Sequence, residues 1–62
     1  MCEANVYMER EGVEELVMES VDIVEPEENG AWRLVGIFGD RKTIRGRLKE
    51  MKLVDHRIVF TA

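Results

Sequence analysis

The stretch that decides the fold is PEENGAWRLVGIFGD, residues 26–40. Its Asn29-Gly30 pair is a strong signal for a tight hairpin turn, because both residues tolerate the positive φ angles that such turns require. Residues 31–38 then alternate as a strand does, which places Trp32, Leu34, Gly36 and Phe38 on one face and Ala31, Arg33, Val35 and Ile37 on the other. Both faces are largely apolar, so the pattern predicts a strand in the interior of a sheet.

Further strands are predicted on both sides of this stretch. Residues 2–8 alternate between apolar and polar side chains, a period of two that indicates a first strand with one buried face. Residues 13–24 fit either an amphipathic helix or a bent strand rich in β-branched side chains, and we favour the strand. A fourth strand is expected over residues 43–48, with a bulge or bend at Gly46, and a fifth near residues 56–61.

Five short strands about ten residues apart predict an all-β fold. The expected architecture is a small five-stranded, partly open barrel of the Sm-like or OB-like kind. No linker, repeat or low-complexity tract interrupts the 62 residues, so residues 1–62 are expected to form a single small β-barrel domain. That length excludes multidomain enzymes and the large α/β enzyme scaffolds.

The short chain also predicts a homodimer. A domain of this size buries only about 60% of the surface that its unfolded chain exposes, and Cys2, the one cysteine, cannot form an internal disulfide. Association of two copies would supply the missing burial. Val35 and Ile37, on the second face of the interior strand, are expected among the residues buried between chains.

Hydropathy indicates the cellular compartment in which the protein is found. Its apolar runs are too short to cross a bilayer, and its start lacks the basic flank and apolar stretch of a signal peptide, so we expect a cytoplasmic protein.

The net charge of −4 divides into −9 over residues 1–30 and +5 over residues 31–62. The two halves are expected to pair across a dimer or within the barrel, or to form two solvated faces.

Cys2 is the side chain with the most distinctive chemistry. If Met1 is removed, Cys2 carries a free amine and a thiol on adjacent carbons, and these close a five-membered chelate ring. If Met1 is retained, its amine, the Cys2 amide nitrogen and the Cys2 sulfur form fused rings around one ion. Nitrogen and thiolate donors favour Ni(II), Cu or Zn over hard ions. The alternative is that Cys2 is a small apolar residue of the first strand.

One chain offers too few donors to enclose a metal ion. Two chains related by a two-fold axis, with their N-termini adjacent, would provide two nitrogens and two sulfurs. His56, the only histidine, could add an imidazole nitrogen at the mouth of the barrel near the N-terminus. The alternative for His56 is a hydrogen-bonded surface residue at the start of a strand.

A basic run in the C-terminal half suggests a different function, RNA binding. Its central residues are Arg41, Lys42, Arg45 and Arg47, and Lys49, Lys52 and Arg57 extend it. Such cations neutralise phosphates, but a single-strand site also needs aromatic side chains for stacking, and none is interleaved with this run. Because the protein is also acidic overall, we regard nucleic acid as the less favoured partner.

Enzymatic activity is not expected. The sequence contains no phosphate-cradling loop and no arrangement of serine, histidine and carboxylate for nucleophilic catalysis. A chain of this length also leaves little room for a pocket that could tune paired carboxylates.

Together these features resemble the CooT family of small nickel-binding proteins. The segments that carry the resemblance span nearly the whole chain: Met1-Cys2-Glu3-Ala4, Val6-Tyr7, Glu15-Leu16-Val17-Met18-Glu19, Val21, Gly36-Ile37-Phe38-Gly39, Gly46 and Asp55-His56-Arg57-Ile58-Val59. HypC-type hydrogenase maturation chaperones are similar in size and also begin with Met-Cys. They carry an Ile/Val-Pro pair soon after the cysteine, where this chain has Asn5-Val6.

The resemblance to CooT implies a homodimeric β protein that binds Ni(II) transiently and supplies it to carbon monoxide dehydrogenase or another nickel enzyme. It also implies that Cys2 is the metal ligand at the dimer interface. Relatives have been described as RNA-binding proteins as well, which is the alternative function noted above.

Overall fold

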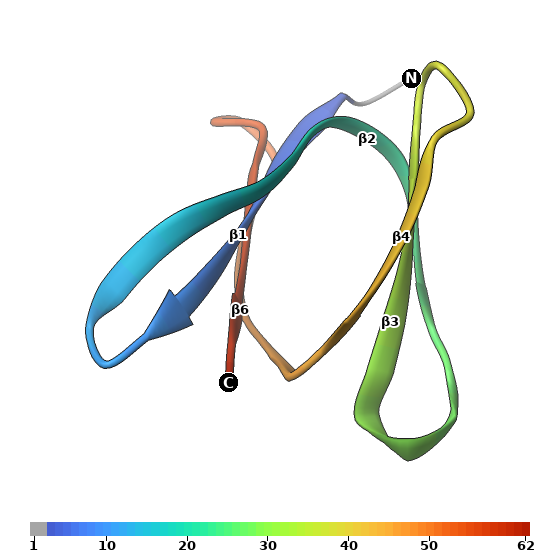
Figure 1. Cartoon of the computed structure of the whole chain (residues 1–62). Coiled ribbons are helices and arrows are strands. Elements are labelled where there is room, and N and C mark those ends of the chain that lie inside the picture. The colour runs from blue at the N-terminus through green and yellow to red at the C-terminus, as the bar shows by residue number, and fades with distance from the viewer. Residues whose placement is uncertain (1–2) are drawn as a thin grey trace.

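The computed structural model describes residues 3–62 and consists of one curved, six-stranded sheet (Figure 1). The order across the sheet is β4-β3-β2-β1-β6-β5. The elements are β1 (Ala4–Arg10), β2 (Val13–Pro26), a 3-10 turn η1 (Glu28–Gly30), β3 (Ala31–Gly36), β4 (Arg41–Arg45), β5 (Arg47–Lys52) and β6 (Arg57–Thr61). The all-β prediction is confirmed, and residues 13–24 form a strand rather than a helix.

The predicted number of strands, five, is wrong. Residues 43–48 were expected to form one strand bent at Gly46, but the chain turns a corner there and gives two strands, β4 and β5. The interior strand is also shorter than predicted, because β3 ends at Gly36 and leaves Ile37 and Phe38 in the turn that follows. This strand does lie inside the sheet, between β2 and β4.

Curvature of the sheet originates in the long strand β2. Its first half pairs with β1, and its second half, from Val21 onward, pairs with β3. Against β1, Met18 lies opposite Val6 while Leu16 lies opposite Tyr7, so β2 contains one residue more than its partner at this point. Ser20 adds a left-handed backbone with φ of 53°. Bulges of this kind bend a strand, and β2 therefore turns from one side of the molecule to the other.

The two edges of the sheet, β4 and β5, follow one another in the chain through Gly46. At this corner the Gly46 N–H donates to the Gly30 carbonyl at 3.1 Å, and the Trp32 indole N–H donates to the Gly46 carbonyl at 3.1 Å. The open sheet is thus curled until its edges meet at one point. This is the partly open barrel that the strand pattern predicted.

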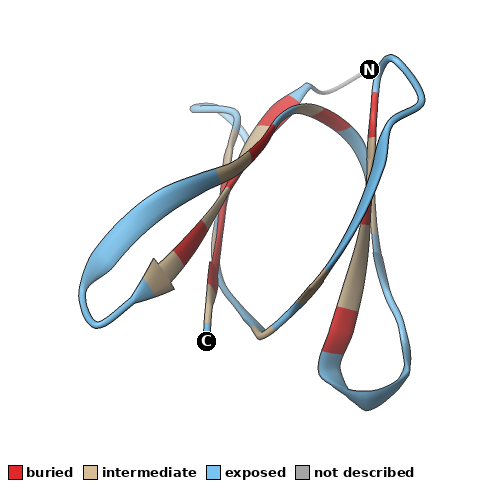
Figure 2. Cartoon of the chain, in the orientation of Figure 1, coloured by how far each residue is buried: buried red, intermediate tan, exposed pale blue. Residues whose placement is uncertain are grey.

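The core lies on the concave side of the sheet. Val6, Leu34 and Phe60, from three different strands, are fully buried, and the Trp32 ring packs on Phe60 with 5.1 Å between ring centroids. Buried and less buried residues alternate along β1, as predicted, whereas the outer part of the hairpin formed by β1 and β2 is exposed (Figure 2). On its other side β1 pairs with β6, and this pairing is parallel.

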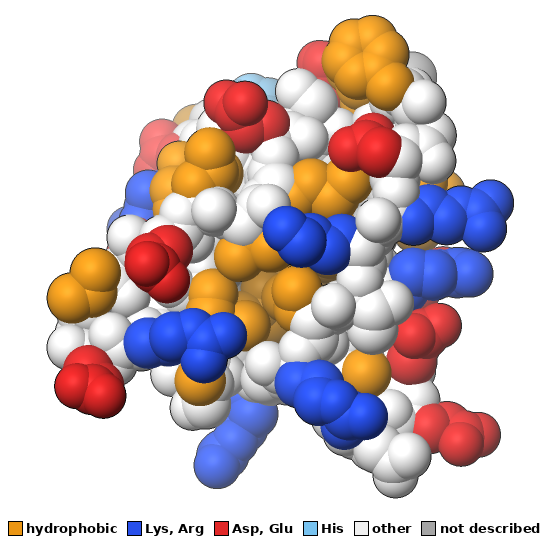
Figure 3. All heavy atoms as spheres, viewed as in Figure 1, with side chains coloured by type: hydrophobic (Ala, Val, Ile, Leu, Met, Phe, Trp, Pro, Cys, Tyr) orange, Lys and Arg blue, Asp and Glu red, His pale blue; other side chains and the backbone are white. Residues whose placement is uncertain are grey.

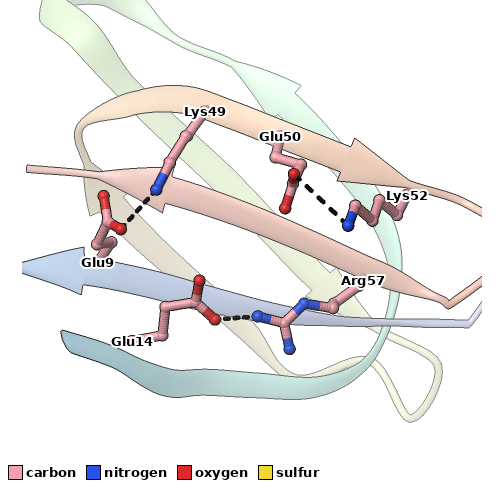
Figure 4. Close-up of polar contacts among 6 residues, drawn as sticks. All are labelled: Glu9, Glu14, Lys49, Glu50, Lys52 and Arg57. Atoms are coloured by element: carbon pink, nitrogen blue, oxygen red, sulfur yellow. Dashed lines mark hydrogen bonds and ion pairs between the residues drawn. The ribbon is translucent and has the colours of Figure 1, made fainter. Parts of the chain in front are cut away.

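Ion pairs link the acidic and basic halves of the chain on the convex side of the sheet. Glu9 on β1 pairs with Lys49 on β5, and Glu14 on β2 pairs with Arg57 on β6 (Figure 4). The hydrogen bond from Lys49 to Glu9 raises the pKa of Lys49 above its ordinary value. Part of the segregated charge is therefore matched within the barrel.

Gly46→Ala is expected to lower the free energy of unfolding by about 3 kcal/mol. A Cβ atom at this position would lie 2.7 Å from the backbone oxygen of Thr61, and that backbone cannot withdraw without breaking the end of β6. Urea unfolding followed by Trp32 fluorescence measures the loss.

Gly12→Ala is the matched control for this experiment. Gly12 has a φ of 80°, but no atom lies within 4 Å of an added Cβ. The free energy of unfolding of this control should therefore fall only by the cost of alanine in a left-handed backbone, about 1 kcal/mol. Equal losses in the two variants would contradict the role given to the corner.

Candidate metal centre

Three elements meet at the end of the barrel where β1 begins, which we call the N-terminal end. The Asn5 side-chain oxygen accepts a hydrogen bond from the Ser20 N–H at 3.3 Å, at the bend of β2. The Ser20 carbonyl in turn accepts from the Ile37 N–H, just after β3, at 2.9 Å. The first residues of β1 are therefore held against the bend of β2 and the end of β3.

His56 lies at the same end, in the turn that leads into β6. Its backbone is left-handed, with φ of 54°, and its N–H donates to the Leu53 carbonyl at 3.1 Å. The His56 carbonyl accepts from the Asn5 N–H at 2.8 Å, and the ring atom Nδ1 lies 3.0 Å from the Glu3 carbonyl oxygen. Main chain and side chain of His56 are thus both joined to the beginning of β1.

The contact with Glu3 determines which ring nitrogen of His56 is free. A carbonyl oxygen can only accept, so Nδ1 carries the proton and donates it. In neutral imidazole the lone pair then lies on Nε2. Histidines that bind metals are commonly oriented in this way, with the other ring N–H donated to a carbonyl or carboxylate.

The predicted ligand atoms at the chain start belong to Met1 and Cys2, which lie outside the described residues. Glu3, whose carbonyl holds the His56 ring, follows Cys2 directly in the sequence. Within residues 3–62 no group of three or more His, Cys, Asp or Glu side chains is placed to hold a metal ion. A complete donor set built on His56 therefore needs atoms from beyond these residues or from another molecule.

Two apolar side chains project from turns at the N-terminal end. Phe38, after β3, is 89% exposed, and Val54, in the turn before β6, is 93% exposed. Ile37 lies beside Phe38 and is also exposed, while Val35 on β3 is half-buried. These turns are held by hydrogen bonds from Gly39 N–H to the Gly36 carbonyl and from His56 N–H to the Leu53 carbonyl. The exposed apolar side chains are therefore presented on ordered backbone.

The residues considered for RNA binding lie elsewhere, along the edge of the sheet. Arg41, Lys42 and Arg45 belong to β4, and Arg47 begins β5 beyond the corner at Gly46. All four are exposed. The structure thus divides the basic run of the sequence over two strands and both faces of β4.

The sequence predicted that His56 lies at the mouth of the barrel near the N-terminus, and the structure places its ring beside the Glu3 carbonyl. It did not foresee the bond to the Glu3 carbonyl, which joins residues 53 positions apart. This bond forms because β1 pairs in parallel with β6, and the residue pattern of neither strand predicts that pairing.

Two comparisons with known proteins give a family. The model of the family described as CO dehydrogenase accessory protein CooT matches residues 1–61. A crystal structure of a candidate CooT from Carboxydothermus hydrogenoformans is similar, with 43% sequence identity and a TM-score of 0.88, and the match covers 97% of this chain and 95% of that chain. No curated protein matches the chain.

The described part of the chain, residues 3–62, contains no helix that is long and apolar enough to span a membrane.

His56→Ala is expected to lower the free energy of unfolding by about 2 kcal/mol. The variant loses the bond to Glu3 and places alanine in a left-handed backbone. In His56→Asn the amide N–H can still donate, and asparagine tolerates positive φ, so less than half of that loss is expected. Thermal unfolding gives the stabilities, and amide hydrogen exchange at Asn5 reports on the start of β1. Equal losses in both variants would show that the side-chain bond does not hold this segment.

Proposed function

The chain belongs to the CooT family of CO dehydrogenase accessory proteins, and from that membership we propose that it binds Ni(II) through Cys2 and passes the ion to a CO dehydrogenase. Nickel is the cargo of the protein in this proposal, held transiently and released to the enzyme. The observation that carries the proposal is the bond between His56 and Glu3, because it fixes an imidazole beside the residue that follows Cys2. The family is described as an accessory protein of an enzyme, which agrees with the expectation that this chain is not itself an enzyme.

The donor atoms near Cys2 suit nickel. Cys2 contributes a thiolate, and the chain start contributes nitrogen: the amine of Cys2 if Met1 is removed, or the amine of Met1 with the Cys2 amide if it is retained. Such mixed nitrogen and sulfur sets select Ni(II), Cu or Zn over Mg or Ca. The lone pair on His56 Nε2, at the end of the barrel where β1 begins, is available as a further nitrogen donor.

A homodimer completes the set in this proposal. One chain start supplies about half of the donors that a four-coordinate ion needs, and a two-fold axis at the N-terminal end brings two starts together. The exposed Phe38 and Val54 support this arrangement, because contact between the two copies would remove both side chains from water. Ile37, predicted from the sequence to lie between chains, is exposed at this end as well.

Sedimentation velocity at micromolar concentration is expected to give twice the mass of the chain. Replacing Phe38 and Val54 together by glutamate should shift the protein to monomers, because charges would then be buried between the copies. Val13→Glu is the control, since Val13 is 61% exposed at the far hairpin. A wild-type protein that sediments only as a single chain would exclude the dimer.

Nickel titration tests the metal site directly. Calorimetry and thiolate-to-metal absorption should show one Ni(II) per two chains, with tight binding abolished in Cys2→Ser and changed modestly in His56→Asn. Binding should release protons and fade below neutral pH, because thiol and amine must deprotonate before they bind.

Two further results would decide between the ligands. Residues added ahead of Met1 should weaken binding, and undiminished binding in such an extended chain would exclude the terminal amine. Stoichiometric binding retained in Cys2→Ser, with the fold intact by circular dichroism, would refute the site.

A further inference from the structure

A hollow of about 480 Å³ opens on the concave side, between the first half of β2 and β4. We call it the β2–β4 hollow. Its floor is apolar and includes Met8, Val17 and Ile44. Figure 3 shows hydrophobic side chains at the bottom of a hollow in the centre of this face, with Lys and Arg side chains around it.

The cations around the hollow are Arg10, Lys42 and Arg45, against a single carboxylate, Glu15. Lys42 lies on the inner side of β4, since it pairs with the fully buried Leu34 across the ladder. The hollow thus combines an apolar floor with a surplus of positive charge, although the whole protein carries −4.

Four of the nine Lys and Arg residues form ion pairs within residues 3–62. Those in ion pairs lie on β3, β5 and β6: Arg33, Lys49, Lys52 and Arg57. Within residues 3–62, the three cations of the hollow form no ion pair. A carboxylate entering the hollow would therefore meet cations that no acidic side chain has neutralised, where a direct charge pair is most favourable.

The hollow is also bordered by an unpaired strand edge. Residues 13–19 of β2 pair with β1 on one side, and β3 begins to pair only at Val21. Within the described chain, the Val17 carbonyl accepts a hydrogen bond from the Lys42 ammonium at 3.3 Å. Free backbone groups along such an edge can pair with an added strand.

We propose that the β2–β4 hollow binds an extended, acidic peptide segment of a partner protein, which adds as a strand to the free edge of β2. Alternate side chains of such a segment point to opposite sides. Its apolar residues pack on Val17 and Ile44, and its carboxylates meet Lys42 and Arg10. The proposal does not depend on nickel, because the hollow lies toward the hairpin and away from the N-terminal end.

Several features favour a peptide over RNA as the occupant. Bases need exposed aromatic faces, but Trp32 packs on Phe60 in the core, and Tyr7 is covered by the Arg57 guanidinium 4.4 Å from its ring centroid. The exposed Phe38 does not line the hollow. Glu15 would repel a continuous row of phosphates, whereas a peptide can place an apolar residue beside it. A strand edge offers backbone hydrogen bonds to a peptide and has no such complement in RNA.

Fluorescence anisotropy with a fluorescein-labelled decapeptide of alternating glutamate and valine tests the proposal. The wild-type protein should bind this peptide and not its counterpart with lysine in place of glutamate. Lys42→Gln combined with Arg10→Gln should weaken binding by about tenfold, the equivalent of two lost charge-assisted contacts. The control, Arg33→Gln combined with Lys52→Gln, removes two cations that are already paired and should leave affinity unchanged. Equal weakening in both double variants would show that net charge alone causes the effect, and this result would overturn the proposed site.

Backbone methylation of the probe tests strand addition separately. The same peptide is made with N-methyl groups on alternate residues, in both possible phases, and one phase should lose binding because its outward N–H groups are gone. If both phases bind like the unmodified peptide, the free edge of β2 is not used and the proposal fails. A labelled oligouridylate of equal length that binds more tightly than the peptide would also overturn it, in favour of RNA.

Discussion

The close approach of three backbone segments at Gly46 is the constraint on which the architecture depends. A side chain there would meet the Thr61 backbone oxygen at 2.7 Å, and the Gly46 N–H and carbonyl are both used, by Gly30 and by the Trp32 indole. Because β4 and β5 join at this point, the corner sets where the two edges of the sheet meet. The same corner holds the Trp32 indole, whose ring packs on the fully buried Phe60.

The sequence pattern predicted what depends on neighbours in the chain. Alternation identified β1 and β3, and the β-branched residues of 13–24 favoured the strand that the structure contains. The strand count was wrong because a glycine in an extended segment is compatible with a bulge or with a corner, and only contacts with Gly30 and Thr61 make it a corner. The parallel pairing of β1 with β6 could not be predicted either, since it depends on the register of strands from opposite ends of the chain.

The same distinction applies to the candidate site. Cys2 could be singled out because its chemistry follows from its position, and His56 because it is the one histidine. That the His56 ring donates to the Glu3 carbonyl required the fold. The same holds for the charged residues. The sequence showed an acidic and a basic half, but the individual partners follow from the fold: Lys49 pairs with Glu9, and Lys42 donates to the Val17 carbonyl. A basic run in the sequence therefore contains residues with different roles.

The parallel pairing of β1 with β6 also sets the order of events during synthesis. Val6 pairs with Ile58, so one side of the first strand has no partner until nearly the whole chain has left the ribosome. Contacts between such distant residues carry the cost of closing a long loop and form late in folding. The imidazole of His56 reaches Glu3 only after that step. A nascent chain that has released only its first residues therefore lacks the assembled end of the barrel.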